Sequence, residues 1–192
     1  MKIYFTAAIS QKPQYGVYYD RIVQCLEKLG HKVVHEHITK VSMQDVSSES
    51  DEKKVKYYRD VLRWITEADI VIAETSFPST LNVGHEVSLS LEKGKPVIAL
   101  HLKGKESVFF SGNQSEKLVY ESYTESTLES VLESSLEYAS DRQDVRFNFF
   151  VSPDIQQYLD WVAKYKRTPR AVYLRELLER DMRENKEWKK KQ

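Results

Sequence analysis

The 192-residue sequence predicts an α/β protein, Rossmann-like or flavodoxin-like, with a parallel sheet of about five strands and helices on both faces. Short apolar runs alternate with segments of helical periodicity through residues 1–138, and this alternation is typical of βαβ units. Two of the runs, 69–74 and 96–101, are apolar almost throughout, which indicates strands buried on both faces. The sequence leaves the order of the strands open.

Hydrophobic spacing gives the elements of the first half. Lys2–Ala8 is a short apolar and aromatic run of strand type. Apolar residues recur at helical spacing through Tyr15–Leu29, which Gly30 ends, and again through Lys53–Thr66. His31–His37 alternates loosely as a second strand. The polar residues that follow this strand, 39–52, predict a mobile loop.

The alternation continues to residue 138. Asp69–Glu74 and Pro96–His101 are the two buried strands, and Asn82–Lys93 between them is helical. Lys117–Ser122 is expected to be a fifth strand and Glu125–Tyr138 a helix. Ligands of open parallel sheets bind beyond the carboxyl ends of the strands, so we expect the site in the loops after the first, third and fourth strands.

Charge divides the chain into two parts. Residues 142–192 hold 13 Lys and Arg against 8 Asp and Glu, a net of +5, whereas residues 1–141 hold 16 against 21, a net of −5. Ser140–Asp144, at the boundary, is polar and linker-like. We therefore expect two domains, 1–141 and 142–192, with different partners.

The second domain is expected to be a small strand–helix–helix unit. Val145–Val151 alternates in the manner of a strand. Ser152-Pro153 and Thr168-Pro169 are both helix-start signals, with a capping hydroxyl before a proline at the first helical position. A unit of this size cannot close a core alone. It must therefore dock on something, and a second copy of the chain is the obvious candidate.

Composition and motifs exclude several classes of protein. The single cysteine, Cys25, allows no intrachain disulfide. No apolar run approaches the roughly 20 residues that span a bilayer, and Met1–Ala8 has the pattern of a strand and not of a leader, so we expect a cytoplasmic protein without membrane partners. P-loop, GxGxxG, GxSxG and HExxH motifs are missing from the sequence, and we expect no cofactor.

Two histidines are candidate metal ligands. His35 and His37 are two residues apart, so on a strand they point the same way. Neither a cysteine nor a carboxylate cluster completes such a site, because Glu36 would face away. We therefore expect no metal, and structural or supporting roles for both histidines.

The densest group of chemically useful residues lies between positions 58 and 86. Glu86 is predicted in the first turn of a helix that opens near Gly84, where the helix dipole favours the ionised carboxylate that a nucleophile needs. Gly84 permits close approach of a ligand to the backbone. Asp60, on the preceding helix, is expected to face the same cleft, and two carboxylates suit retaining glycoside cleavage. On spacing alone, ordinary solvated surface residues are the commoner interpretation of both carboxylates.

Seven short motifs occur in one order over residues 2–123. They are Ile3-Tyr4-Phe5, His35-Glu36-His37, Arg59-Asp60 with Trp64, Ala68–Glu74, Pro78-Ser79, Val83–Glu86 and Gly94-Lys95-Pro96. With these motifs the sequence resembles the nucleoside 2-deoxyribosyltransferase family, and in particular its branch of 2'-deoxynucleoside 5'-phosphate N-hydrolases. Several motifs in one order make this a specific signal.

The resemblance implies cleavage or transfer of the N-glycosidic bond of a 2'-deoxynucleoside or its 5'-monophosphate. It implies that Glu86 is a covalent nucleophile and that Asp60 protonates the leaving base or holds the sugar. Tyr4 would orient the glutamate, and Ser79 would lie near the 5' position of the sugar. Ser107 loosely matches a serine that a neighbouring subunit lends to the site, so a homo-oligomer is implied.

Two departures from the family pattern bear on the substrate. The N-hydrolase branch has a Gly-Ser-Ile-Arg type turn after the first strand, which helps to hold the 5'-phosphate. Here the turn is Ala7–Ser10, so Ala8 and Ser10 take the substrate-binding positions and the arginine is replaced. The segment Pro78–Glu86 is one residue longer than usual, with Thr80-Leu81-Asn82 where a shorter glycine-bearing segment is expected. The base, the need for a phosphate, and the choice between hydrolase and transferase stay open.

The second domain resembles a ribbon-helix-helix module. In that family two chains pair their strands, and outward strand residues enter the DNA major groove. The resemblance implies a homodimer with Arg146 and Asn148 as candidate DNA-facing residues, whereas the outward Phe150 is unsuited to base edges. Dimerisation without DNA is therefore favoured. The competing function for the whole chain is a non-enzymatic nucleotide-sensing or DNA-binding regulator.

Overall fold

The structure, a computed structural model, describes residues 1–48, 50–140, 150–166 and 168–190. The chain divides into two compact units, Met1–Asp144 and Val145–Gln192. This division lies beside the polar stretch at which the sequence predicts a change of domain. Among the described residues, only the first unit contains a sheet.

Five parallel strands form the sheet of the first unit, in the order β2-β1-β3-β4-β5. The strands are β1 (Lys2–Ala7), β2 (Lys32–Val34), β3 (Ile70–Glu74), β4 (Val97–Leu102) and β5 (Leu118–Tyr123). The predicted α/β fold is confirmed, and the strand order is flavodoxin-like. The direction of chain progression switches between β1 and β3, where ligands of such sheets bind beyond the carboxyl ends of the strands.

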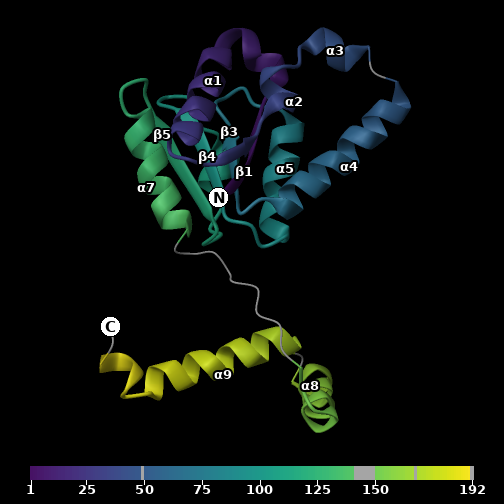
Figure 1. Ribbon diagram of the computed structural model, residues 1–192, viewed down its shortest axis with the longest axis vertical. Helices are drawn as coiled ribbons and strands as arrows, with labels where there is room; N and C mark the ends of the chain where they lie inside the picture. Colours follow the sequence, from purple (N-terminus) through teal and green to yellow (C-terminus); the bar gives the residue numbers. More distant parts are fainter. Residues whose placement is uncertain (49, 141–149, 167, 191–192) are drawn as a thin grey trace. The chain divides into compact units, whose positions relative to one another are not determined.

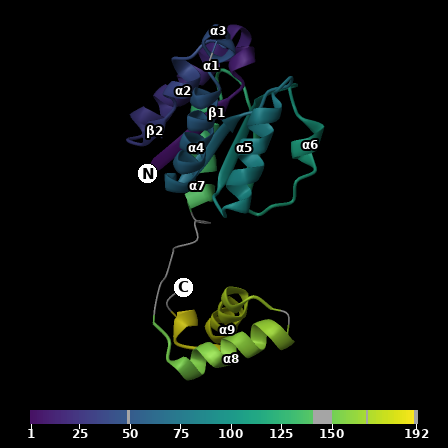
Figure 2. The same ribbon diagram turned by 90° about the vertical axis from the view of Figure 1, so that its right-hand side faces the viewer.

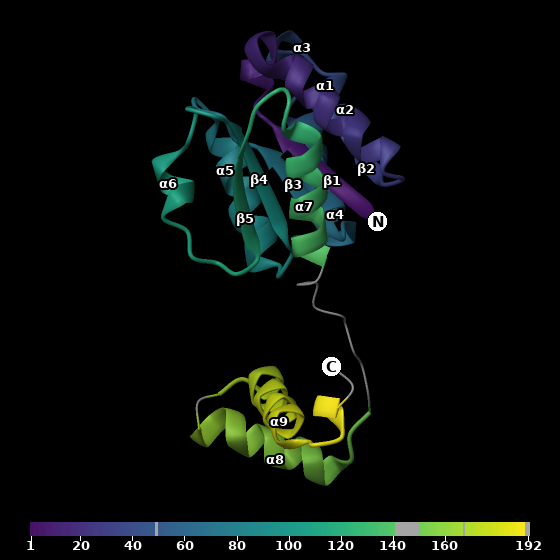
Figure 3. The ribbon, with the colours of Figure 1, turned by 90° about the vertical axis from the view of Figure 1, so that its left-hand side faces the viewer.

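Two helices cover each face of this sheet. They are α1 (Lys12–Lys28) and α7 (Leu128–Ser140) on one face, and α4 (Asp51–Glu67) and α5 (Leu81–Glu92) on the other (Figure 1). Figure 3 shows α7 lying along its face of the sheet. Side chains alternate along β3, so Ile70 and Ile72 join the core under α1 and α7, whereas Val71 and Ala73 join the core under α4 and α5.

Short helical segments fill the connections between these elements. They are the 3-10 helix η1 (Ile9–Gln11), α2 (Glu36–Thr39), α3 (Met43–Ser47) and α6 (Val108–Ser111). The prediction of an irregular loop at 39–52 is therefore wrong in part. Ser42 and Asp45 form a capping box that starts α3, a local signal that the overall polarity of the segment hides. None of the helices in the described part of the chain is long and apolar enough to cross a membrane.

The second predicted strand is wrong at its end. β2 stops at Val34, and α2 begins at Glu36 with His35 as its N-cap residue. His35 and His37 therefore do not share a strand face. Nδ1 of His35 lies 2.8 Å from Oγ1 of Thr39, whereas His37 is buried. Within the described ranges, no group of three or more His, Cys, Asp or Glu is placed to hold a metal ion.

The second unit contains two packed helices and a final 3-10 turn. They are α8 (Pro153–Tyr165), α9 (Arg170–Glu184) and η2 (Trp188–Lys190), and Figure 2 shows α8 and α9 side by side. The hydroxyl of Ser152 caps α8, because it accepts a hydrogen bond of 3.4 Å from the Ile155 amide. Thr168 makes no such bond. Pro169 is itself the N-cap residue of α9, so the second predicted start signal is wrong by one position.

Most of the predicted ribbon strand lies outside the described residues. Arg146 and Asn148 lie outside the described residues, and Phe150 and Val151, which are described, are not in a strand. Two side chains of the described part of this unit are buried, Leu159 and Val162. A pair of buried side chains is too little apolar burial to stabilise a domain.

Candidate active site

Glu86 lies in the second turn of α5, so the prediction that it sits in the first turn is wrong. The helix begins at Leu81, because the hydroxyl of Thr80 accepts a hydrogen bond of 3.5 Å from the Val83 amide and caps the helix there. The field of a helix end falls off within the first turn. The helix dipole therefore contributes little to the ionisation of Glu86, and its other surroundings decide it.

Burial and two hydroxyls set the charge state of Glu86. Its side chain is 7% exposed, and this burial raises the pKa of the carboxyl group. The hydroxyls of Thr6 and Tyr4 act in the opposite direction and lower the same pKa. The Tyr4 hydroxyl donates a hydrogen bond of 2.9 Å to Oε2 of Glu86. This hydrogen bond fixes the orientation of the carboxylate.

Tyr4 is itself held in an aromatic cluster. Its ring stacks on His37 with ring centroids 5.1 Å apart and an angle of 4° between the planes, and Trp64 stacks on it at 6.2 Å. Tyr57 contacts both His37 and Trp64. These rings, brought together from β1, α2 and α4, make Tyr4 a rigid support for Glu86.

His37 is the member of this cluster that sequence reasoning missed. Burial lowers the pKa of His37 to about 4, so the imidazole is neutral near pH 7. Neither of its ring nitrogens has a hydrogen-bond partner among the described residues. His37 lines neither of the cavities beside Glu86, so its contribution to the site is the ring that it stacks on Tyr4. The sequence signal for His37 is its place in the His35-Glu36-His37 motif, one of the motifs that carry the family resemblance.

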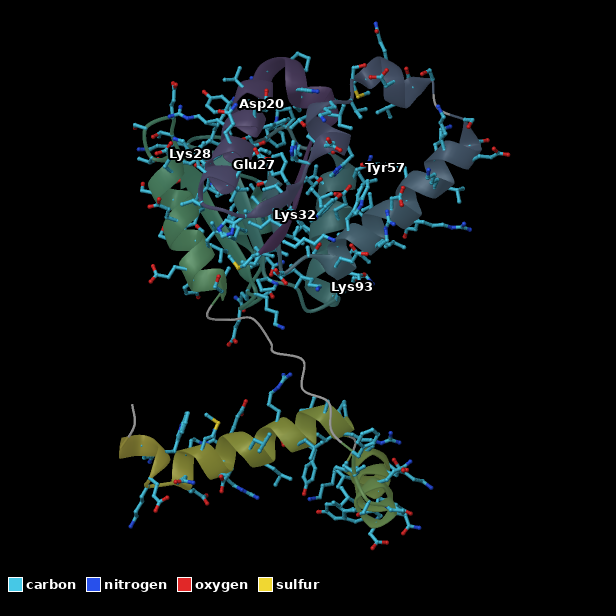
Figure 4. The ribbon with its side chains drawn as sticks, viewed as in Figure 1. Asp20, Glu27, Lys28, Lys32, Tyr57 and Lys93 are labelled. Atoms are coloured by element: carbon cyan, nitrogen blue, oxygen red, sulfur yellow. The ribbon has the colours of Figure 1, made fainter. Side chains whose placement is uncertain are left out.

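Glu86 borders two cavities, with volumes of about 160 Å³ and 210 Å³. Glu86, Asn82 and Tyr57 line both, and Figure 4 shows Tyr57 on the side of α4 that faces the rest of the unit. The first cavity is completed by Ala7, Ile9, Ser10, Ile38, Met43, Val46, Thr80 and Val83. The second is completed by Lys54, Tyr58, Val61, His85 and Leu89. Together they form a site at the β1/β3 switch point of the sheet.

The structure does not bring Asp60 into these cavities. Asp60 lies on α4, and its Oδ1 accepts a hydrogen bond of 2.8 Å from Nη2 of Arg63, one turn along the same helix. Its side chain is 27% exposed and lines neither cavity. The expectation that Asp60 faces the cleft beside Glu86 is therefore not met in this arrangement, in which Arg63 takes the carboxylate.

The turn after β1 contributes one of its two predicted contacts. Ser10 lines the first cavity, whereas Ala8 is buried and its carbonyl accepts a hydrogen bond of 3.2 Å from the Tyr19 hydroxyl. The nearest cation in the sequence, Lys12, is already engaged. Its Nζ donates hydrogen bonds of 2.5 Å to the Thr39 carbonyl and 2.9 Å to the Val41 carbonyl. Lys12 thus stabilises the chain after α2 and is not free to balance a phosphate.

The remaining predicted substrate contacts line neither cavity; they are Ser79, Gly84 and Ser107. Ser79 has a buried hydroxyl with no partner among the described residues, and Gly84 has open space where a Cβ would stand. Ser107 begins α6, and its amide donates a hydrogen bond of 2.7 Å to the Tyr120 hydroxyl. Figure 2 shows α4, α5 and α6 in that order across the view, and Ser107 is the N-cap residue of α6.

Comparison with known proteins points to one kind of chemistry. No family model matches the sequence. The chain is 37% identical over 103 residues to a "Putative 2'-deoxynucleoside 5'-phosphate N-hydrolase 1" of Thermofilum pendens, which covers 54% of this chain and 69% of the relative. It is 31% identical to a protein of the same name from Syntrophotalea carbinolica, over 65% of this chain and 88% of the relative.

A third relative and one solved structure extend the comparison. The 5-hydroxymethyl-dUMP N-hydrolase of Rattus norvegicus is 32% identical over 51% of this chain, and the match spans 59% of that relative. The structure of a Clostridium botulinum CMP N-glycosidase superimposes with a TM-score of 0.52 at 15% identity, over 69% of this chain and 99% of the other. At this identity the structural likeness supports the fold.

Proposed function

The chain belongs to the nucleoside deoxyribosyltransferase-like family of enzymes that act on N-glycosidic bonds, and we propose that it uses Glu86 to cleave a 2'-deoxynucleoside or its 5'-monophosphate. The observation that carries the proposal is the buried Glu86 carboxylate, oriented by Tyr4 and open to two cavities. The relatives from Thermofilum pendens and Syntrophotalea carbinolica, of which 69% and 88% are covered, both carry the name "Putative 2'-deoxynucleoside 5'-phosphate N-hydrolase 1". The alternative of a non-enzymatic sensor or DNA-binding regulator has no comparable support.

The proposed reaction proceeds in two displacements. Oε1 of ionised Glu86 attacks C1' of the sugar, the C1'–N bond breaks, and its electron pair leaves with the base, which takes up a proton. The product is an ester between the deoxyribosyl group and Glu86. Water then adds to C1', loses a proton and releases the carboxylate, which gives free deoxyribose or its 5'-phosphate. Hydrolysis and transfer share the first step and differ in whether water or a second base completes the second.

Four side chains have proposed supporting roles. Tyr4 holds Glu86 in place and stabilises its ionised form through the hydrogen bond of 2.9 Å. Asp60 is retained as the candidate acid for the leaving base, a role that requires it to exchange Arg63 for the substrate. Ser10 and Ser79 are proposed to lie near the 5' position. Because Lys12 is engaged by backbone carbonyls, the phosphate of a monophosphate would depend on hydroxyl and amide donors.

We propose that the second unit dimerises the chain. Large apolar side chains of α8 and α9 remain open to water in a single copy, including Trp161, Tyr165 and Leu178. A second copy would cover them in a homodimer or a higher homo-oligomer, and a neighbouring copy could then lend Ser107 to the site. Binding of DNA through Arg146 and Asn148 is the second candidate role of this unit, which an electrophoretic mobility assay at stated salt tests directly.

Product analysis tests the proposed function. The protein is incubated with each 2'-deoxynucleoside and each 5'-monophosphate, and free base is measured by liquid chromatography. We expect release of free base, an adduct on the intact protein in rapidly quenched samples, and loss of both in Glu86→Gln. Glu92→Gln, an exposed residue at the end of the same helix, is the matched control. No release of base from any substrate would overturn the enzymatic function, and an active Glu86→Gln protein would overturn the mechanism.

A second free base distinguishes the two outcomes of the intermediate. If the intermediate is open to bases, adding adenine or cytosine to a reaction with a different deoxynucleoside should divert product from free sugar to a new nucleoside. If water alone reaches it, free sugar or sugar phosphate forms at the same rate with and without the added base. The ratio of the products therefore separates transferase from hydrolase.

A further inference from the structure

Asn82 and Glu86 share one face of α5. They are four residues apart in a helix, which places them one above the other with Cβ atoms roughly 5–6 Å apart. Both side chains line both cavities. The side-chain amide of Asn82 therefore lies one helical turn before the proposed nucleophile and borders the same two cavities.

The helix itself does not need an asparagine at this position. Asparagine is a weak helix former whose usual value lies in capping, and Thr80 already caps α5. Asn82 is exposed, and within the described ranges its carboxamide takes part in no hydrogen bond. The hydrogen-bonding capacity of the side chain is thus available to a ligand, with two donors on nitrogen and an acceptor oxygen.

The other polar groups of the first cavity are less suited to hydrogen-bond a ligand. The Thr80 hydroxyl is used by the Val83 amide. Glu86 is held by Tyr4 through Oε2. Ser10 belongs to η1, on a different element from the nucleophile. Asn82 lines the first cavity and lies within the same helix as Glu86, so the helix backbone holds the two residues one turn apart.

We propose that Asn82 binds a hydroxyl group of the deoxyribose whose C1' faces Glu86. The inference rests on the proposed function and adds a residue that determines how the sugar is held. With C1' at the carboxylate, the remainder of the small furanose ring lies within reach of a group one helical turn away. A hydroxyl both donates and accepts hydrogen bonds, which matches a carboxamide. The structure leaves two hydroxyls as candidates, at the 3' and 5' positions.

Comparing variants with modified substrates identifies the contact. Binding is measured by calorimetry in the Glu86→Gln protein, with and without Asn82→Ala, so that turnover is not required. The ligands are 2'-deoxyuridine, its 2',3'-dideoxy analogue and its 2',5'-dideoxy analogue. Asn82→Ala should weaken binding of 2'-deoxyuridine about tenfold, the value of one hydrogen bond in a binding site. The same substitution should leave unchanged the binding of whichever analogue lacks the contacted hydroxyl.

Controls separate this proposal from its premise. Ser88→Ala, an exposed substitution on α5 that lines neither cavity, should bind all three ligands normally. Equal weakening for all three ligands, or no weakening for 2'-deoxyuridine, overturns the assignment of Asn82. If the assignment of Asn82 fails in this way, release of base by the protein with Glu86 intact shows that the proposed function still holds. If Glu86→Gln binds no deoxynucleoside and the unmodified protein releases no base, both are overturned.

Discussion

The hydroxyl of Tyr4 donates a hydrogen bond of 2.9 Å to Oε2 of Glu86, a residue 82 positions further along the chain. Tyr4 is on β1, an inner strand of the sheet, and Glu86 is on α5, which covers one face. Both side chains are buried. In such a place a carboxylate is destabilised by lost hydration, and the phenol restores part of that stabilisation while fixing the direction of attack.

Removing this hydrogen bond should shift the pH dependence of the reaction. Glu86 attacks only when ionised, so kcat/KM should fall as pH drops through its pKa. Tyr4→Phe removes a donor that lowers this pKa. The acidic limb of the kcat/KM profile should therefore move to higher pH, with a loss of about ten- to a hundredfold at neutral pH. Tyr165→Phe, in the second unit, serves as the control. An unchanged acidic limb in Tyr4→Phe would show that the phenol does not act on Glu86.

The role of Asp60 can be separated from its ion pair with Arg63. If Asp60 protonates the leaving base, Asp60→Asn should lower kcat about a hundredfold, and the loss should shrink for bases that leave readily as anions. Arg63→Met frees Asp60 from its partner and should retain activity. Asp51→Asn, on the same helix and paired with Lys54, is the matched control. Full activity of Asp60→Asn with a poor leaving group would contradict the acid role.

Glu74 should make the stability of the first unit depend on pH. Its carboxyl group accepts hydrogen bonds from Ser76 and Tyr123, and burial raises its pKa from 4.5 to about 7. Between these values the folded protein keeps a proton that the unfolded chain has lost. The contribution of Glu74 to the free energy of unfolding therefore decreases as pH rises through this window, by about 3 kcal/mol in total.

Glu74→Gln keeps a neutral group at this position at every pH. In urea unfolding it should match the unmodified protein near pH 4.5 and become the more stable of the two near pH 8. Glu121→Gln, exposed on β5, should follow the unmodified protein at both pH values. Parallel stability curves for Glu74→Gln and the unmodified protein would contradict the shifted titration of Glu74.

The aromatic surface of α8 should control self-association. Trp161 is 46% exposed and stacks on Tyr158, whose hydroxyl lies 2.9 Å from that of Tyr173. Aromatic side chains that are buried on binding contribute much of the energy of an interface. We expect a homodimer in sedimentation velocity, and a dissociation constant raised about ten- to a hundredfold by Trp161→Ala. Gln157→Ala is the control on the same helix, and a monomeric full-length chain would contradict the proposal.

The extent of sequence-based prediction differed between the fold and the site. Strand and helix positions in the first unit follow from apolar spacing, a local property, and most predicted bounds lie within a few residues of the observed ones. The errors occur where a short-range signal competes with the average character of a segment. Ser42 starts a helix inside a polar stretch, and Thr80 starts α5 earlier than Gly84 suggested. In both cases a capping hydroxyl sets the residue at which the helix begins.

The sequence by itself determined the α/β class, the two-part organisation and Glu86 as the candidate nucleophile, because apolar periodicity and ordered motifs are written along the chain. Only the tertiary structure decided the strand order, the burial of Glu86, its bond to Tyr4 and the place of Asn82 in both cavities. It also brought Lys12 into contact with the backbone carbonyls of Thr39 and Val41. The physical reason is that hydration and hydrogen bonding depend on groups far apart in sequence, which spacing along the chain does not specify.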